Sequence, residues 1–334
     1  MKMMISLGIA VLCVILTGCS EGQLGTGSGT ESSGFTLIPT VRIQTLRPQA
    51  LSIVKKGLAS ENAYIRSNAV EIVATTKCRE MMPDILARLS DPSAVVRFAA
   101  ASAIGDMQCF GYDKQVAKLL DDANENVQIA AAYALVKLNQ PEYHGKISQA
   151  TLSPDQTVRA NAVLLLGKLG NRNDMDLLYD ALGADDSEDK VRLQAVESIA
   201  RLGDEQMYRG KLWALLISKY ADDRVMGIRG MGALGTTEAK NAILIMLQDD
   251  VREVRLAAAE QLGELGDKRG QDEVYQYFQS SPDLNQVDMA NNMAVMAIGR
   301  IGTGRLEAYL PDALASRSES IRLLAAQSVL LLTQ

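Results

Sequence analysis

A helical pattern that returns nine times constrains this 334-residue chain more than any other feature. Its clearest copy is Val254–Gly266, with the sequence VRLAAAEQLGELG. Counted from Val254, a small residue follows after four positions and an apolar residue after eight. These steps keep the three side chains on one face of a helix. The copies lie 31 to 36 residues apart, a period that is typical of stacked helical repeats.

Each copy carries further elements at fixed places. The residue five positions before the reference is always Ser, Asp or Asn, which favour turns and helix starts. A second segment with helical spacing, such as Met82–Leu89, precedes that turn residue. The sequence therefore predicts repeats of two antiparallel helices joined by a short turn. The nine reference residues are Ile65, Val96, Val127, Val158, Val191, Asp223, Val254, Ala290 and Ile321.

The residue four positions after the reference is alanine or glycine in all nine copies. Alanine suits any helix, but propensity alone does not explain a small residue at this one position throughout. We therefore expect the paired helix to approach closely at this point. The glycines from Gly227 to Gly235 are interpreted in the same way, as packing or kink positions inside a helix and not as a ligand loop.

The segments Asp91–Gly105 (DPSAVVRFAAASAIG) and Val254–Gly266 resemble HEAT repeats, particularly the short bacterial kind known from phycobilin lyases. The resemblance covers about residues 45–334. It implies an all-α fold, a right-handed α-solenoid of about nine antiparallel helix pairs within residues 44–334. Nine such layers would make a curved rod about 80–90 Å long. The resemblance does not specify a function, because many unrelated binding proteins use this repeat.

The N-terminus has the features of an export signal. Lys2 precedes an apolar run, Met3–Leu16, that is shorter than the about 20 residues of a membrane span, so residues 1–18 are predicted to be a signal peptide. The ending Leu16-Thr17-Gly18-Cys19 resembles the bacterial lipoprotein box. That resemblance implies cleavage before Cys19 and acylation of its sulfur by chains such as palmitate. An ordinary signal peptide with a chance cysteine is the alternative.

Residues 19–43 are rich in Gly, Ser and Thr and are predicted to form a flexible tether. The expected location is therefore the bacterial cell envelope, with a lipid anchor. In a diderm bacterium, Ser20 after the cysteine favours the outer membrane, facing the periplasm, because inner-membrane retention is associated with Asp at that position. The formal net charge of −6 disfavours generic nucleic-acid binding, since phosphate attraction needs a basic face.

Signatures of catalysis are not found in the sequence. The single histidine, His144, has no second histidine at helical spacing and is expected on the surface of a loop between repeats. No G-x-S-x-G, C-x-x-C or phosphate-binding glycine loop occurs. We therefore expect a non-enzymatic protein with no catalytic residue, no metal site and no cofactor.

Two cysteines remain after the predicted cleavage site besides Cys19, namely Cys78 and Cys109. Each lies thirteen residues after its reference residue, in adjacent repeats. An oxidising compartment favours a Cys78–Cys109 disulfide. Equivalent positions in stacked repeats about 10 Å apart would exceed the usual Cα separation of a disulfide, which favours two independent thiols. Both alternatives remain open at this point.

Two surfaces are candidate contacts. Lys137, Lys168 and Arg201 lie ten residues after successive references and would form a basic ladder for an acidic ligand or anionic lipid. The alternative is that these three side chains are ordinary solvated charges near helix C-termini, where a cation interacts favourably with the helix dipole.

The second candidate surface lies at the C-terminal end. Leu323, Leu324 and Leu331 occupy positions that are often polar in earlier copies, so they would form an end face for a partner or a second copy. Packing on the preceding helix near Leu306–Leu314 is the alternative. The first helix, 45–58, contains Ser52, Lys55 and Lys56 and is predicted to be a polar cap at the other end.

These observations favour a membrane-anchored scaffold that binds another protein. A binder of envelope polysaccharide or lipid is the second hypothesis, and a lyase or chaperone-like enzyme related to phycobilin lyases is the third. The partner's identity and the oligomeric state do not follow from the sequence.

Overall fold

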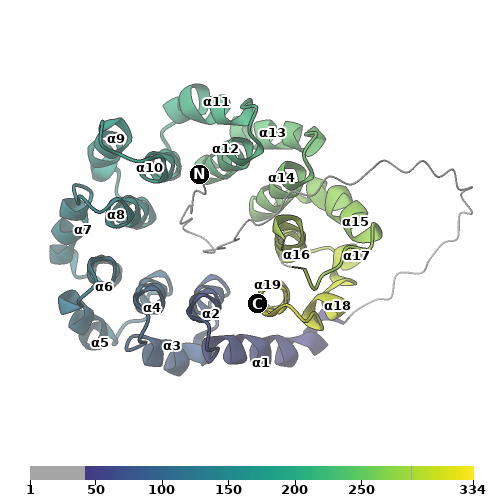
Figure 1. Ribbon diagram of the computed structural model, residues 1–334, viewed down its shortest axis with the longest axis horizontal. Coiled ribbons are helices and arrows are strands. Elements are labelled where there is room, and N and C mark those ends of the chain that lie inside the picture. The colour runs from purple at the N-terminus through teal and green to yellow at the C-terminus, as the bar shows by residue number, and fades with distance from the viewer. Residues whose placement is uncertain (1–41, 287) are drawn as a thin grey trace, which may run out of the picture.

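The computed structural model describes residues 42–286 and 288–334, which fold into helices and connecting turns with no β-strand in these ranges. Helices alternate between an inner and an outer layer (Figure 1). The inner layer consists of α2 (Ala63–Thr75), α4 (Ala94–Asp106), α6 (Glu125–Lys137), α8 (Gln156–Leu169), α10 (Asp189–Arg201), α12 (Ala221–Leu234), α14 (Arg252–Glu264), α16 (Met289–Ile301) and α19 (Glu319–Leu332). An all-α solenoid of nine helix pairs within the described residues agrees with the prediction.

The outer helices are shorter and often begin or end in 3-10 turns. They are α1 (Arg47–Leu58), α3 (Met82–Arg88), α5 (Asp113–Ala117), α7 (His144–Ala150), α9 (Met175–Gly183), α11 (Trp213–Leu216), α13 (Thr237–Ile245), α15 (Gln271–Gln279), and the pair α17 (Gly304–Glu307) and α18 (Leu310–Leu314). A π-helical segment, Tyr208–Leu212, leads directly into α11.

The predicted turn residues close the turns but do not cap the inner helices themselves. The Asp91 carboxylate accepts a hydrogen bond from the backbone N–H of Ser93 at 3.0 Å, two residues further on. Asp122 and Asp249 do the same. The capping side chain comes later, as with Asp155, which accepts from the N–H of Thr157 at the start of α8. In such repeats one polar residue closes the turn and a second, two positions later, caps the inner helix.

The small residue in each inner helix is fully buried, as expected. All eight alanines at this position have no exposed surface, and Gly227 takes the place of the ninth. A Cβ atom at Gly227 would lie 2.9 Å from the backbone nitrogen of Leu216 in α11. The outer helix therefore approaches so closely here that only glycine fits, which confirms the packing interpretation.

Consecutive repeats are joined by what we call the arginine ladder. In four of the nine repeats, the arginine after the reference residue bonds to the backbone of its own turn and to an aspartate in the next turn. Arg66 donates to the Ser60 carbonyl at 2.8 Å and to both carboxylate oxygens of Asp91 at 2.7 and 2.8 Å. The same aspartate contact is made by Arg97 with Asp122, Arg159 with Asp186, and Arg224 with Asp249.

The nine repeats close into a ring, so the prediction of an open rod is wrong (Figure 1). Helix α19 packs against α1 and α2, and we call this contact the seam. Leu323 of α19 is buried against Gly57 of α1, where an added Cβ would lie 2.8 Å from a Leu323 methyl carbon. Arg47 donates to the Thr333 hydroxyl at 3.2 Å, and Ser60 donates to Glu319 at 3.4 Å.

Ring closure also corrects two expectations about the ends. Leu323 and Leu324 are buried within this chain and Leu331 is half-buried, so they do not form an open end face. The alternative prediction was that these leucines pack near Leu306–Leu314. Leu323 instead packs against Gly57 of α1. Helix α1 keeps Lys55 and Lys56 exposed while it buries Val54, Gly57 and Leu58, so it is a closing element and not a free cap.

Candidate functional site

The inner face of the ring carries a bonded cluster of polar side chains from three successive inner helices. The Tyr133 hydroxyl of α6 donates to Asp106 of α4 at 2.5 Å, and Lys168 of α8 donates to the other oxygen of Asp106 at 2.6 Å. The Lys168 ammonium also lies 5.4 Å from the centre of the Tyr133 ring. Helices α4 and α8 belong to repeats separated by α6, so this contact is possible only on the concave side.

Burial and the charge of Asp106 raise the pKa of the Tyr133 hydroxyl well above its usual value. Tyr133 therefore stays protonated and acts as a donor. Because Asp106 receives a hydrogen bond from Tyr133 and an ion pair from Lys168, the cluster fixes the positions of α4, α6 and α8 relative to one another. Its charges are largely satisfied within the protein.

Two of the three cations in the predicted basic ladder of Lys137, Lys168 and Arg201 are thus paired with acidic side chains of the chain itself. Lys168 pairs with Asp106, and Arg201 pairs with Glu197 one turn earlier in α10 at 2.6 Å. Lys137 is half-buried and forms no ion pair within residues 42–286 and 288–334. Of the three predicted cations, Lys137 is therefore the one that the described structure leaves open to an anionic group of a ligand.

A second charged cluster lies on inner helices α12, α14 and α16. It contains Arg229, Glu260, Glu264 and Arg300, with an ion pair between Arg300 and Glu264. Burial raises the pKa of Glu260, while the charges of Arg229 and Arg300 act in the opposite direction. Sequence reasoning missed this cluster, because the four residues occupy two different positions of the repeat.

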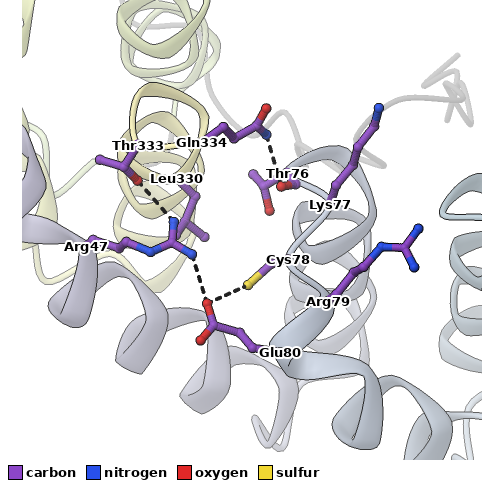
Figure 2. Close-up of a pocket in the computed structure, with 9 residues that line it drawn as sticks. All are labelled: Arg47, Thr76, Lys77, Cys78, Arg79, Glu80, Leu330, Thr333 and Gln334. Carbon is purple, nitrogen blue, oxygen red and sulfur yellow. Dashed lines mark hydrogen bonds and ion pairs between the residues drawn. The ribbon is translucent and has the colours of Figure 1, made fainter.

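The seam contains a pocket of about 440 Å³ (Figure 2). Its walls come from the start of α1, the connection after α2 and the end of α19, which are far apart in the sequence. The lining residues are Arg47, Thr76, Lys77, Cys78, Arg79, Glu80, Leu330, Thr333 and Gln334. The pocket exists only because the ring closes, so sequence reasoning had no signal for it.

Most polar groups of this pocket bond to one another. Arg47 donates to Glu80 at 2.9 Å as well as to Thr333, and the Gln334 amide donates to the Thr76 carbonyl at 3.0 Å (Figure 2). Lys77 and Arg79 are exposed at the rim. The pocket therefore links the first and last repeats by hydrogen bonds, and its excess of cations suits a small anionic or polar molecule.

Cys78 and Cys109 are free, buried thiols, so the structure has the second of the two alternatives and not the disulfide. The Cys78 thiol donates to Glu80 at 3.4 Å, and the Cys109 thiol faces the sulfur of Met82 at 3.5 Å. Burial and the nearby carboxylate of Glu80 raise the pKa of Cys78 to about 11, and burial raises the pKa of Cys109. Both thiols are thus poor nucleophiles at neutral pH.

His144 begins α7 and does not lie in a loop, which corrects the sequence-based expectation. Its Nε2 lies 3.0 Å from Asp174 of the next repeat, and its Nδ1 lies 3.2 Å from the Ser148 hydroxyl. Ser148 also donates to the His144 carbonyl, as side chains one helical turn apart commonly do. The Asp174 contact joins the outer layers of adjacent repeats, and we assign His144 this structural role.

Within the described ranges, no three His, Cys, Asp or Glu side chains lie close enough together to hold a metal ion. In the same part of the chain no helix combines the length and the apolar character needed to cross a membrane. Cys19, the predicted signal peptide and most of the predicted tether lie outside the described residues.

The fold defines an all-α solenoid protein built from paired helices. Family models of HEAT repeats match residues 51–120, 145–216 and 240–268. The chain therefore belongs to the HEAT-repeat proteins. Among curated proteins no match to the sequence is found.

Several solved structures are similar to this chain. The phycocyanin lyase complex CpcE–CpcF of Nostoc sp. is 16% identical, with a TM-score of 0.42 over 82% of this chain and 98% of that one. Human deoxyhypusine hydroxylase is 16% identical, with a TM-score of 0.39 over 78% of this chain and 99% of that one. Kap121p bound to Nup53p is 14% identical, with a TM-score of 0.34 over 83% of this chain and 37% of that one. Similarity at this level concerns the fold alone.

Proposed function

We propose that this protein is a lipid-anchored, non-enzymatic scaffold of the bacterial cell envelope that binds another protein on the inner face of its ring. The observation that carries the proposal is the closed ring itself. Packing between neighbouring inner helices, the four contacts of the arginine ladder and the seam hold the nine inner helices in one arrangement, which presents a long continuous surface. Such a surface recognises a partner by shape and by a few charges.

The state of the reactive groups supports a binding role. The two described thiols are buried with raised pKa values. His144 is held between Asp174 and Ser148 in the outer layer, away from the inner face. Inner-face charges such as Asp106 and Lys168 bond to each other. Groups engaged in this way stabilise a shape and are poorly placed for proton transfer to a substrate.

The envelope location rests on the N-terminal sequence. The short apolar run ending in Leu16-Thr17-Gly18-Cys19 supports export and acylation. More than one acyl chain on one residue gives stable membrane attachment, which a single chain does not. The sequence between Cys19 and the first described helix would then connect the ring to the bilayer.

Photo-crosslinking in cells tests the binding surface. A photoreactive amino acid at Lys137, on the inner face, should give covalent adducts with a protein partner that mass spectrometry can identify. The same group at Gln149, which is exposed on outer helix α7, serves as the matched control and should give at least fivefold less adduct. The expected difference follows because Lys137 faces the proposed surface and Gln149 does not.

Equal adducts at the two sites, or adducts with glycan or lipid alone, would contradict the scaffold proposal. Mass spectrometry of the mature protein tests the anchor separately. The expected N-terminal residue is an acylated Cys19, and an unmodified residue 19 would overturn the anchor while leaving the scaffold to be judged by the crosslinks.

A further inference from the structure

The chain is acidic overall, but one stretch of it contains only basic charged residues. Residues 206–221 read QMYRGKLWALLISKYA and contain Arg209, Lys211 and Lys219 but no acidic residue. They also contain Trp213, the only tryptophan of the protein. The stretch forms the π-helical segment, α11 and the turn that leads into α12.

Three large side chains of this stretch are exposed. Trp213 is 38% exposed, Ile217 is 69% exposed and Tyr220 is 60% exposed. Ile245, at the end of the next outer helix α13, is 63% exposed. Helices α11 and α13 both pack on α12 and lie next to each other on the outside of the ring (Figure 1). We call Trp213, Ile217, Tyr220 and Ile245 the outer patch.

The outer patch stands on a rigid base. Leu212 and Leu216 are buried beneath it, and they sit against Gly230 and Gly227 of α12. The Tyr208 and Trp213 rings are in contact, with centres 6.0 Å apart. The Lys219 ammonium lies 4.9 Å from the centre of the Tyr220 ring. The segment that carries these exposed side chains is therefore firmly packed on the ring.

The combination of aromatic, aliphatic and basic side chains favours a bilayer surface as the binding partner of the outer patch. Tryptophan and tyrosine prefer the headgroup level of a bilayer, where the ring is partly buried and the polar atom stays hydrated. Lysine and arginine extend their charged ends toward anionic headgroups while their methylene groups cover apolar surface. Protein interfaces are instead depleted in lysine, whereas two of the three cations here are lysines.

We propose that the outer patch, together with Arg209, Lys211 and Lys219, docks the ring on a bilayer that contains anionic lipid. Isoleucine and tryptophan insert at the interface, and the three cations face the lipid phosphates. The biological setting of this contact rests on the proposed membrane location. The contact itself does not require the acyl anchor, because it involves only residues of the ring.

Trp213 provides a direct test, since its fluorescence comes from the patch alone. The protein used begins at residue 19 and carries Cys19→Ser, so it has the tether and the ring but no acyl group. It is titrated with phosphatidylcholine vesicles that contain about one-third phosphatidylglycerol, a fraction chosen to give a strong negative surface potential. The expected result is a shift of the Trp213 emission to shorter wavelength and quenching by brominated phosphatidylcholine. Vesicles of phosphatidylcholine alone should bind at least tenfold more weakly.

Two variants separate the apolar and the electrostatic contributions. Ile217→Ser with Ile245→Ser should weaken vesicle binding at least tenfold while Trp213 remains as the reporter. Arg209→Gln, Lys211→Gln and Lys219→Gln together should abolish the preference for phosphatidylglycerol. Phe110→Ser is the matched control, because Phe110 is equally exposed in a different loop, and it should bind like the unmodified ring.

An unchanged Trp213 emission at saturating vesicle concentration would overturn the inference and leave the outer patch to a protein partner. Binding that is unaffected by the two isoleucine substitutions would overturn it as well. Neither outcome bears on Cys19 acylation or on crosslinks from the inner face, so failure here is distinguishable from failure of the proposed function.

Discussion

Replacing Arg66 with methionine should lower the free energy of unfolding by about 2–4 kcal/mol, because it leaves a buried carboxylate without its main partner. The Asp91 side chain is only 1% exposed and the Arg66 side chain is 10% exposed. Arg88, at 3.3 Å from Asp91, replaces part of the lost interaction, which keeps the expected effect below the largest values for broken buried ion pairs. Urea denaturation followed by circular dichroism measures the change.

This effect should depend on pH in a defined direction. Burial raises the pKa of Asp91, but hydrogen bonds from Arg66 and from the Ser93 N–H outweigh it, so the pKa lies below its usual value. A carboxyl with a lowered pKa stabilises the fold above its unfolded pKa of about 3.9, and this contribution is lost as the pH falls through the folded value. The difference between the Arg66→Met variant and the original protein should therefore be full at neutral pH and shrink below about pH 4.

Arg269→Met is the matched control for the Arg66 experiment. Arg269 also pairs with an aspartate, Asp267, but its side chain is 61% exposed. Water and counterions weaken such a pair, so its loss should lower the free energy of unfolding far less than the loss of Arg66 does. If both variants were destabilised equally, or if Arg66→Met had no effect, the arginine ladder would not be a main source of cohesion between repeats.

The second large effect is expected at the seam, where Leu323→Asp should detach α1 from α19. Leu323 is buried against Gly57, and an aspartate there would bring an unpaired charge into an apolar contact. The seam also lacks a ladder aspartate, as four of the other joints do. Arg322 donates only to the carbonyls of Ser316 and Arg317, because Ser60 stands where Asp91, Asp122, Asp186 and Asp249 stand in other repeats. The charge that Leu323→Asp introduces lies at this joint alone, so the ring should open here before the repeats unfold.

Hydrogen exchange followed by mass spectrometry measures this opening. Amides of α1 and α19 should lose protection at least tenfold, while those of α6, α8 and α10 should keep it, because solenoid repeats depend mainly on their neighbours. Leu152→Asp is the control, since Leu152 is 74% exposed in a turn far from the seam, and it should leave protection unchanged. Uniform loss of protection in Leu323→Asp would show that the ring unfolds as a unit and would contradict a distinct seam.

The repeat unit could be predicted from sequence because its determinants are local and recur nine times. Small residues such as Ala69 and Ala100 mark the contact between paired helices, and the turn residues mark where the pairs are joined. The sequence showed the arginines and the aspartates of the arginine ladder, but it did not show that they pair. Arg66 and Asp91 both stand at recurring positions, but their pairing depends on the distance between successive repeats.

Ring closure and the sites that depend on it could not be predicted in this way. Closure results from a small rotation between each repeat and the next, and no single residue determines the total rotation over nine repeats. The signals that bore on it were Leu323 and Leu324 in the last repeat and the buried stripe of Val54, Gly57 and Leu58 in the first. The leucines were interpreted as an end face for a partner, whereas the first helix was predicted to be a polar cap. The structure shows that these two helices pack on each other. The seam pocket and the Asp106–Lys168 contact follow from the same curvature.

Crosslinking across the seam tests the central claim, the closed ring, most directly. Ser60→Cys and Glu319→Cys are combined with Cys19→Ser, Cys78→Ala and Cys109→Ala, and the monomer is treated with a short bismaleimide. The two side chains meet at 3.4 Å in the ring, so mass spectrometry should find one chain linked between positions 60 and 319. The matched pair Ser60→Cys and Asp155→Cys, three repeats apart, should give no such link. A monomer that never links 60 to 319 would be an open rod, with these positions near its two ends about 80 Å apart, and would contradict the account.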